Sequence, residues 1–262
     1  MRARAATHNL THSTQRNACF PPTPSRIRSA RVRTAESFAF KYGRVEVSAR
    51  LPRGDWQWPA IWMMPAGNNY GEWPASGEID IVESRGNARG DPGGGCESVS
   101  STLHYGPVWP YDGYPSTFAE YTLPSGDFSE AFHTFGFLWN QTRMQTYVDD
   151  IIVLDVDTTI PFFEKGNFSS ALDNPWVGRG PNAPFDSRFY LILNVAVGGT
   201  NNYFPDGLNN SKPWSNTAAH AANDFWAGVN EWGPSWTTPF EVDSVRVWQF
   251  APGGDYVIRP MI

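Results

Sequence analysis

Three carboxylates within six residues constrain the fold of this chain more than any other feature. Glu78, Asp80 and Glu83 are separated by aliphatic residues, a pattern typical of a β-strand whose successive side chains point to opposite faces. Glu78 and Asp80 then share one face, but a regular strand would turn Glu83 into the core, where a lone charge is costly. One extra residue near positions 81–82, a β-bulge, would return Glu83 to the carboxylate face. The sequence therefore predicts a bulged strand with three acids on one side.

Tryptophan residues crowd the sequence just before these acids, at positions 56, 58, 62 and 73. A solvated sheet face is the ordinary explanation of charged side chains on one side of a strand. Two features argue against it here: like charges crowded on a sheet face destabilise it, and aromatic residues lie close by. Sugar C–H faces stack on aromatic rings, and two carboxylates cleave glycosidic bonds. The pattern therefore favours a carbohydrate site.

Short alternating or apolar segments, separated by turn residues, run through the rest of the chain. They predict about ten β-strands and no long amphipathic helix, which is typical of one all-β domain. The segments are residues 27–34, 38–51, 56–65, 77–84, 98–106, 133–139, 144–148, 151–156, 189–199 and 240–250. Asp149 and Asp150 have the spacing of a two-residue hairpin turn.

Some segments depart from this alternation. Residues 106–118 predict an aromatic loop, residues 162–165 a short helical turn, and residues 200–238 a long excursion of the kind that is usually functional or ordered around a site. Segment 189–199 is nearly continuously apolar, so it predicts a central strand buried on both faces. Asn194 within it is either a satisfied core amide or a ligand contact.

Domain boundaries follow from where the strand pattern begins and ends. Residues 1–25 are polar and without periodicity, so we expect an irregular leader, and they lack the apolar stretch of a signal peptide. Residues 26–250 are expected to form the single domain, and residues 251–262 a C-terminal tail. Cys19 and Cys96 either form one disulfide or remain two thiols, and the sequence leaves both open.

The composition argues against two classes of partner. A formal net charge of −6 disfavours nucleic acid, which would need a basic face. No run of 18 or more apolar residues occurs, so no membrane-spanning helix is expected. The 24 Gly and 22 Pro indicate many turns and long loops, as in a β-sandwich or barrel.

The chain resembles glycoside hydrolase family 16, in particular its animal laminarinase-like endo-1,3-β-glucanases and the related β-1,3-glucan-binding proteins. Residues 78–83 match the bulged catalytic signature of that family in every position. Further matching blocks follow in the expected order, at residues 58–65, 101–106, 132–136, 194–200 and 242–248. The resemblance covers roughly residues 26–250. It implies a two-sheet antiparallel β-jelly-roll sandwich, concanavalin A-like, whose concave face forms the substrate cleft.

The resemblance also implies a retaining hydrolysis in which each acid has its own role. Glu78 would be the nucleophile that forms the glycosyl-enzyme, and Glu83 the general acid that later acts as base. Asp80 would hold the nucleophile by a hydrogen bond and tune its charge. Two carboxyls about 5–5.5 Å apart across a bulge suit the retaining geometry. Negative neighbours are expected to raise the pKa of Glu83, so that it keeps the proton it must donate.

Candidate substrate-binding residues rest on the same resemblance. Trp73 and Trp58 are expected against sugar rings, whereas core packing is the preferred interpretation of Trp62. His104 matches a family histidine near the acid/base, and a strand histidine satisfied by backbone is the alternative. The remaining candidates are Asn194 and three loop residues, Arg53, Asn68 and Trp109.

The resemblance implies a monomer that binds β-1,3-glucan polysaccharide or oligosaccharide, needs no cofactor and lies outside the cell. Several family sequences carry a calcium ion on the convex side of the sandwich. No cluster of oxygen ligands is visible here that would establish such a site. No metal-ligating residues are therefore predicted.

The sequence is also compatible with other functions. A non-catalytic β-1,3-glucan recognition protein of innate immunity has the same fold but has usually lost the catalytic acids, so the presence of Glu78 and Glu83 favours an enzyme. A β-1,3-1,4-glucanase or an agarase-like galactanase tends to use the signature without the bulge residue, which disfavours both. Family members begin with strands upstream of residues 29–34, which residues 1–25 do not supply. The N-terminus is expected to be shortened, leaving sheet edge and core uncovered, and a misfolded product is the third alternative.

Overall fold

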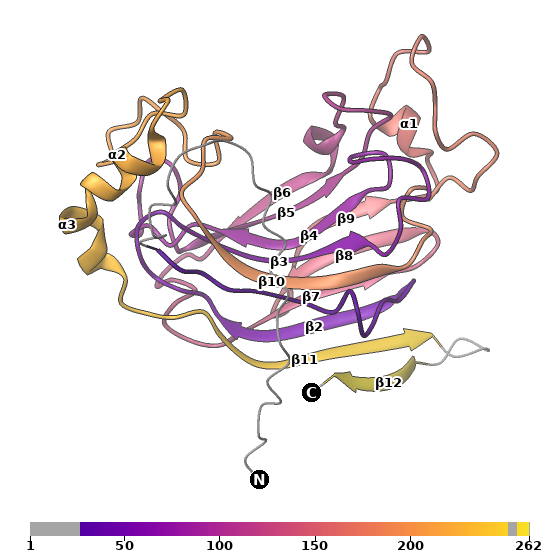
Figure 1. The fold of residues 1–262 in the computed structure, drawn as a ribbon. Helices are drawn as coiled ribbons and strands as arrows, with labels where there is room; N and C mark the ends of the chain where they lie inside the picture. Colours follow the sequence, from indigo (N-terminus) through magenta and orange to yellow (C-terminus); the bar gives the residue numbers. More distant parts are fainter. Residues whose placement is uncertain (1–26, 251–255, 262) are drawn as a thin grey trace.

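Two six-stranded antiparallel sheets pack face to face in the computed structural model, which describes residues 27–250 and 256–261 (Figure 1). The first sheet has the order β1 (Arg31–Arg33), β10 (Phe189–Val197), β3 (Gln57–Pro65), β4 (Glu78–Ser84), β5 (Ser98–His104) and β6 (Phe118–Thr122). The second has the order β12 (Tyr256–Met261), β11 (Glu241–Phe250), β2 (Gly43–Arg50), β7 (His133–Trp139), β8 (Arg143–Val148) and β9 (Ile151–Asp157). The predicted two-sheet antiparallel sandwich is confirmed.

The helices are short and lie at opposite ends of the sandwich (Figure 1). α1 (Phe162–Lys165) forms where the sequence predicts a helical turn, and α2 (Ala221–Ala227) and α3 (Val229–Trp232) lie at the other end. Two 3₁₀ turns complete the set, Tyr114–Thr117 and Gly233–Ser235. Within the described ranges, no helix is long and apolar enough to cross a membrane.

The main core lies between the sheets and follows from the alternation of side chains along each strand. On β2, Val45, Val47 and Ala49 point inward and are fully buried, while the residues between them are half-buried. On β4, Ile79 and Val82 are buried in the same core. Burying each such aliphatic side chain stabilises the fold by about 1.5–3 kcal/mol. The apolar face of β4 is thus anchored in the core, and its acids are left on the other face.

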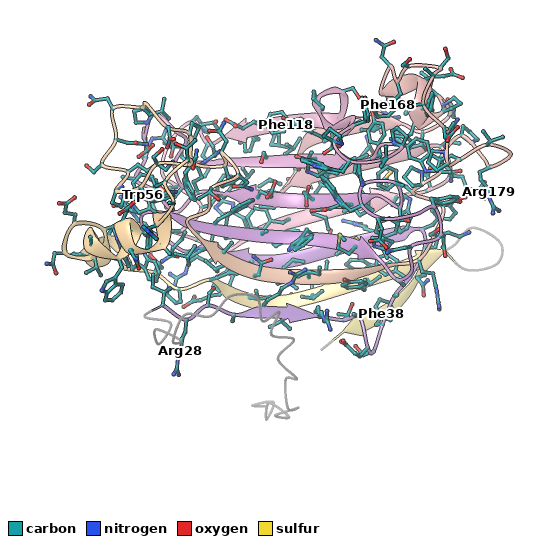
Figure 2. The ribbon with its side chains drawn as sticks, turned by 45° about the horizontal axis from the view of Figure 1, so that its top comes forward. Arg28, Phe38, Trp56, Phe118, Phe168 and Arg179 are labelled. Carbon is teal, nitrogen blue, oxygen red and sulfur yellow. The ribbon has the colours of Figure 1, made fainter. Side chains whose placement is uncertain are left out.

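The excursion over residues 200–238 builds a second, smaller apolar cluster at the α2–α3 end. Its buried members are Trp56, Phe204, Trp214, Phe225 and Trp232. Trp56 precedes β3 and lies at this end of the molecule in Figure 2. Its ring meets that of Trp214 edge to face, with centroids 5.2 Å apart, which is a favoured aromatic geometry. The excursion is therefore ordered against the start of β3.

Two predicted strands differ in extent or burial. The strand expected over residues 38–51 begins only at Gly43, whose φ of +143° lies in the region that favours glycine and where a Cβ would meet the carbonyl oxygen of Trp248 at 2.2 Å. The predicted burial of 189–199 on both faces is wrong: from Leu193 to Val197 the side chains of β10 are half-buried. The reason is that β10 has only the three-residue β1 beyond it and turns one face toward the cleft.

Two of the strands were not predicted from the sequence. β6 follows the aromatic loop and alternates between exposed and half-buried side chains, a signal already present in residues 118–122. β12 pairs with β11, so residues 256–261, predicted as tail, belong to the second sheet. The predicted leader and Cys19 lie outside the described residues, and Cys96 is buried.

Candidate active site

The predicted bulge lies in β4 between Asp80 and Glu83. Toward β5, Asp80 pairs with Thr102 and Glu83 with Ser100, so two residues of β4 face the single residue between those partners. Toward β3 the register also shifts, and Ile81 is passed over. Ile81 and Val82 are both buried in the core, and Glu83 returns to the face that carries Glu78. The bulge is therefore what brings all three acids to one side.

A cleft of about 420 Å³ opens over this face of the first sheet. All three acids line it, together with side chains from β3 and β10 and with residues that lead into β1. The lining side chains from these strands are Trp58, Ala60, Trp62, Glu78, Asp80, Glu83, Asn194, Val195 and Ala196. The concave face expected for a substrate cleft is therefore the face that holds the carboxylates.

Each glutamate accepts a hydrogen bond from a tryptophan indole. Trp73 Nε1 donates to Glu78 Oε2 at 2.7 Å, and Trp58 Nε1 donates to Glu83 Oε1 at 2.8 Å. Both tryptophans are predicted cleft residues, but the hydrogen bonds could not be read from sequence. They depend on the β3–β4 register for Trp58, and on the shape of the loop before β4 for Trp73.

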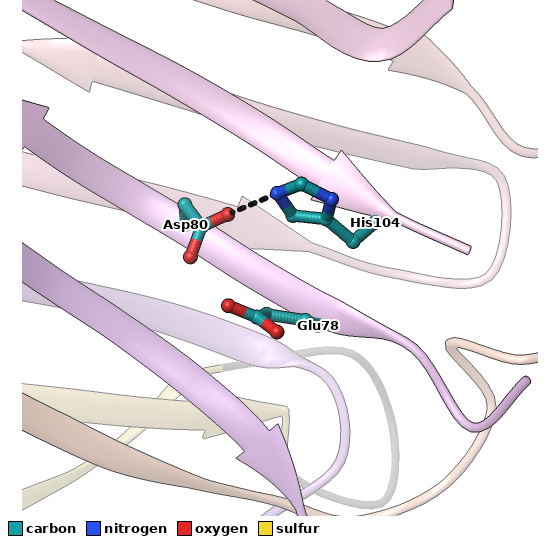
Figure 3. Close-up of side chains that lie close together, drawn as sticks. All are labelled: Glu78, Asp80 and His104. Carbon is teal, nitrogen blue, oxygen red and sulfur yellow. Dashed lines mark ion pairs between the residues drawn. The ribbon is translucent and has the colours of Figure 1, made fainter. Parts of the chain in front are cut away.

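His104 ends β5 and faces two carboxylates. Its Nε2 lies 3.2 Å from Asp80 Oδ2, and its Nδ1 lies 2.6 Å from Asp112 Oδ2. Figure 3 shows the imidazole on β5 reaching toward Asp80 on the neighbouring strand, with Glu78 beside it. The β4–β5 register pairs Glu78 with His104 directly. The alternative of a histidine satisfied by backbone is therefore excluded, and His104 lies at the Glu78 end of the acid row.

The sequence model of Glycosyl hydrolases family 16 matches residues 4–169, more than half of the chain. The chain belongs to this family.

Within family 16 the chain belongs to the laminarinase-like group. It is 50% identical over 234 residues to a Beta-1,3-glucan-binding protein of Penaeus monodon, covering 85% of this chain and 63% of that protein. It is 39% identical over 187 residues to Glucan endo-1,3-beta-glucosidase A1 of Niallia circulans, covering 69% of this chain and 24% of that protein. The chain thus spans less than two thirds of the length of either relative.

The solved catalytic domain of an endo-1,3-beta-glucanase (laminarinase) from Thermotoga petrophila has a similar fold. Its TM-score is 0.50 at 34% sequence identity, over 64% of this chain and 58% of that chain. The jelly-roll sandwich expected from the family resemblance is thus confirmed.

Burial raises the pKa of all three acids of this family 16 protein. It is the largest cause in each case, and neighbouring negative charge adds to it, bringing Glu78 to a pKa of about 8 and Asp80 to a pKa of about 6. The pKa of Glu83 is raised in the same way, although its hydrogen bond from Trp58 and the charge of His104 lower it. The predicted direction for Glu83 agrees, but burial outweighs the neighbouring charges. The three acids titrate as a set that retains a proton near neutral pH.

For His104, neighbouring charges and not burial set the direction of the pKa shift. Burial lowers the pKa of His104, but the hydrogen bond to Asp112 and the contact with Asp80 outweigh it and raise the pKa to about 11. An imidazolium therefore lies among the acids at neutral pH, because both of its ring nitrogens face a carboxylate.

One face of the Trp58 ring is covered by another aromatic side chain. Tyr203, from the 200–238 excursion, stacks on the Trp58 ring at a centroid distance of 3.7 Å and an interplanar angle of 4°. The guanidinium of Arg85 lies 4.0 Å from the Tyr203 ring centre. No signal in the sequence pairs Tyr203 with Trp58, because 145 positions of chain separate them. Trp58 also lines the cleft.

Trp62 is not a core residue. The alternation of β3 buries Ile61 and Met63 and turns Trp58 and Trp62 to the cleft face, so the preferred interpretation of Trp62 is wrong. Trp62 Nε1 donates to Asn194 Oδ1 at 2.6 Å. Asn194 is half-buried and lines the cleft, so it is not a core amide.

The three loop candidates have different surroundings. Trp109 is 65% exposed and its ring lies 5.5 Å from that of Trp73, so it extends the aromatic surface at the Glu78 end. Arg53 does not line the cleft, and its Nη1 donates to Asp127 Oδ2 at 3.0 Å. Asn68 Nδ2 donates to Glu72 Oε1 at 3.1 Å.

In the described part of the chain, one group of side chains has the spacing of a metal site: Glu78, Asp80 and His104. These residues do not fit a metal ion as they stand, because an imidazolium held between two carboxylates has no lone pair to offer.

Proposed function

We propose that this family 16 protein is a retaining endo-hydrolase of 1,3-β-glucosidic bonds in laminarin-type β-glucans. The observation that carries the proposal is the pair Glu78 and Glu83. Both acids are retained, both line one cleft, and each accepts an indole hydrogen bond that holds its carboxyl group in place. A protein that only binds glucan has no need for two buried acids at this cost in desolvation.

The proposed reaction proceeds in two displacements at the anomeric carbon. In the first, a Glu78 oxygen attacks C1 while Glu83 gives its proton to the glycosidic oxygen, and the aglycone leaves as an alcohol. In the second, Glu83 takes a proton from water, the water oxygen attacks C1, and the bond to Glu78 breaks. Two inversions leave the β-configuration unchanged.

The surroundings of each acid shift its pKa. Burial raises the pKa of Glu83, which favours the protonated acid that the first step needs. Glu78 must be ionised to attack. The Trp73 hydrogen bond and the His104 charge both lower its pKa, but burial and the Asp80 charge hold it at about 8, so Glu78 ionises only toward alkaline pH in the free protein. Asp80 lies between them, paired to His104, and its negative charge raises the pKa of Glu78.

Two carboxyl groups and water suffice for this chemistry, so the proposal requires no cofactor or metal. The proposed partner is a β-1,3-glucan polysaccharide or oligosaccharide lying along the cleft, with Trp58, Trp73 and Trp109 against its sugar rings. We propose an extracellular monomer, in keeping with a polysaccharide substrate.

Incubating the purified protein with laminarin and following new reducing ends tests the proposal. We expect chains to be cut internally, so viscosity should fall before small sugars accumulate. Glu78→Gln should abolish the release while laminarin binding, measured by calorimetry, persists. Proton NMR of the first product should show the β-anomer, and an initial α-anomer would contradict the covalent mechanism.

A non-catalytic β-1,3-glucan recognition protein is the second candidate. The observation that favours it is the 50% identity to a Penaeus monodon relative named as a glucan-binding protein. If the wild-type protein folds and binds laminarin but releases no sugar over a range of pH, the enzyme proposal fails and recognition replaces it.

A further inference from the structure

Asp112 is a buried carboxylate at the site to which neither the sequence nor the two-acid mechanism gives a role. It lies in the loop that joins β5 to the 3₁₀ turn Tyr114–Thr117, and its side chain is 9% exposed. We propose that Asp112 is a positioning residue that acts through His104, holding a charged imidazolium against Asp80 beside Glu78. This proposal deepens the proposed function and, for its catalytic part, rests on it.

Both oxygens of Asp112 are engaged. Oδ2 lies 2.6 Å from His104 Nδ1, and Oδ1 accepts from the backbone N–H groups of Tyr105 at 3.3 Å and Tyr114 at 3.1 Å. The loop is further tied by the Gly113 N–H, which donates to the Tyr105 carbonyl at 2.7 Å. The carboxylate therefore cannot rotate without breaking backbone contacts. It is an anchor fixed before substrate arrives.

This anchor decides which way the imidazole faces. With Nδ1 directed at Asp112, Nε2 is directed at Asp80, 3.2 Å away. A neutral ring would present a lone pair to one of the two carboxylates, so the arrangement favours a proton on both nitrogens. Without the Asp112 charge, the ring would keep one carboxylate partner and would be free to turn.

The charged groups around His104 come from two segments. Asp80 and Glu78 face it from β4, and Asp112 faces it from the loop, where the Tyr114 ring also lies 5.3 Å from the imidazole. The imidazolium lowers the pKa of both Asp80 and Glu78. Asp112 contributes to the charge state of the nucleophile through this cation, without itself facing the cleft.

The molecule contains a matched control. His133 Nδ1 lies 2.8 Å from Asp149 Oδ2, and Asp149 Oδ1 accepts from the Thr134 N–H at 2.8 Å. This pair repeats the histidine–carboxylate–backbone arrangement in the second sheet, away from the cleft, at the turn between β8 and β9. Asp149→Asn therefore makes the same chemical change as Asp112→Asn without touching the acids.

Titration of the histidine rings by NMR in the full-length, isotope-labelled protein tests the positioning role directly. His104→Gln assigns the signal. In the wild type, His104 should stay protonated beyond pH 9, and in Asp112→Asn its midpoint should move down by at least one pH unit. Asp149→Asn should leave it unchanged. An unaltered His104 titration in folded Asp112→Asn overturns the proposal, whether or not the protein hydrolyses glucan.

Kinetics test the catalytic part. Asp112→Asn should lower kcat on laminarin about ten-fold with little change in KM, because the cation beside the nucleophile is no longer held in place. Asp112→Glu should recover part of the loss, and Asp149→Asn should match the wild type. A shifted His104 titration with unchanged kcat overturns the catalytic part. A wild-type protein that releases no sugar overturns the proposed function and the catalytic part with it, while the titration still decides the positioning role.

Discussion

The two ends of the acid row have different surroundings. At the Glu78 end the neighbours are charged, with Asp80 and the His104 imidazolium in contact. At the Glu83 end they are aromatic, with the Trp58 indole on the carboxyl and Tyr203 stacked behind it. Burial raises the pKa of both acids, and what opposes it differs: chiefly the His104 cation at Glu78 and the Trp58 indole hydrogen bond at Glu83. Two carboxyl groups on one strand can therefore serve as nucleophile and as general acid, because different segments of the chain surround each of them.

The largest expected effect is that of Glu78→Gln. Without a nucleophile no glycosyl-enzyme can form, so kcat should fall by about 10⁴-fold or more, the scale of loss when a nucleophile is removed. The loss should be equally severe on laminarin and on an aryl β-glucoside, measured by reducing-end and chromophore release. Glu164→Gln, an exposed acid on α1, is the control and should behave as wild type.

Glu83→Gln should distinguish the role of Glu83 as general acid from that of Glu78 as nucleophile. Loss of the general acid should lower kcat on laminarin by about 10²–10⁴-fold. A dinitrophenyl glucoside, whose leaving group needs no proton, should lose far less in the glycosylation step, seen as a retained burst of dinitrophenol. Equal losses in the burst rate and in laminarin hydrolysis would refute the assignment of Glu83 as acid.

Replacing the two indole donors should move opposite limbs of the pH profile. In Trp58→Phe the pKa of Glu83 rises, so the acid keeps its proton longer and the alkaline limb of kcat/KM moves to higher pH. In Trp73→Phe the pKa of Glu78 rises, so the nucleophile ionises later and the acidic limb moves to higher pH. Each shift should be about one pH unit, the scale of a hydrogen bond to a charged group. Movement of the same limb in both variants would contradict the assignment of roles.

The smallest expected effect is on stability. The pKa of Glu78, about 8 in the folded protein, lies above its unfolded value. Its contribution to stability is therefore full below the unfolded pKa and is lost as the pH rises through 8. Glu78→Gln should raise Tm at pH 8 by about 2–4 °C, the change that ~1 kcal/mol makes in a domain of this size. The gain should shrink at pH 5 and be absent in Glu164→Gln, and a constant gain at both values would exclude burial of the charge as its cause.

Local patterns in the sequence were enough to predict most of the strands and the acid row. Alternation identified β7, β8 and β9 almost to the residue, and the five-residue spacing of Glu78 and Glu83 required a bulge where one lies. These features depend on the period of a strand and on the cost of burying a charge, which act within a few residues. Trp62 was misplaced because a tryptophan in an apolar segment has the same local signal in a core and in a cleft.

Only the tertiary structure decided which side chains surround each acid. Asp112 lies 29 residues after Glu83 in the sequence, and Tyr203 lies 120 residues after it. Both are in loops, and no short-range pattern assigns either residue to the site. Their positions depend on strand register and on the packing of the excursion against β3. The sequence by itself determined a bulged strand with three acids on one face of an all-β chain. Burial, a fixed imidazolium and a stacked indole, which set the charges of those acids, exist only once distant segments have been brought together.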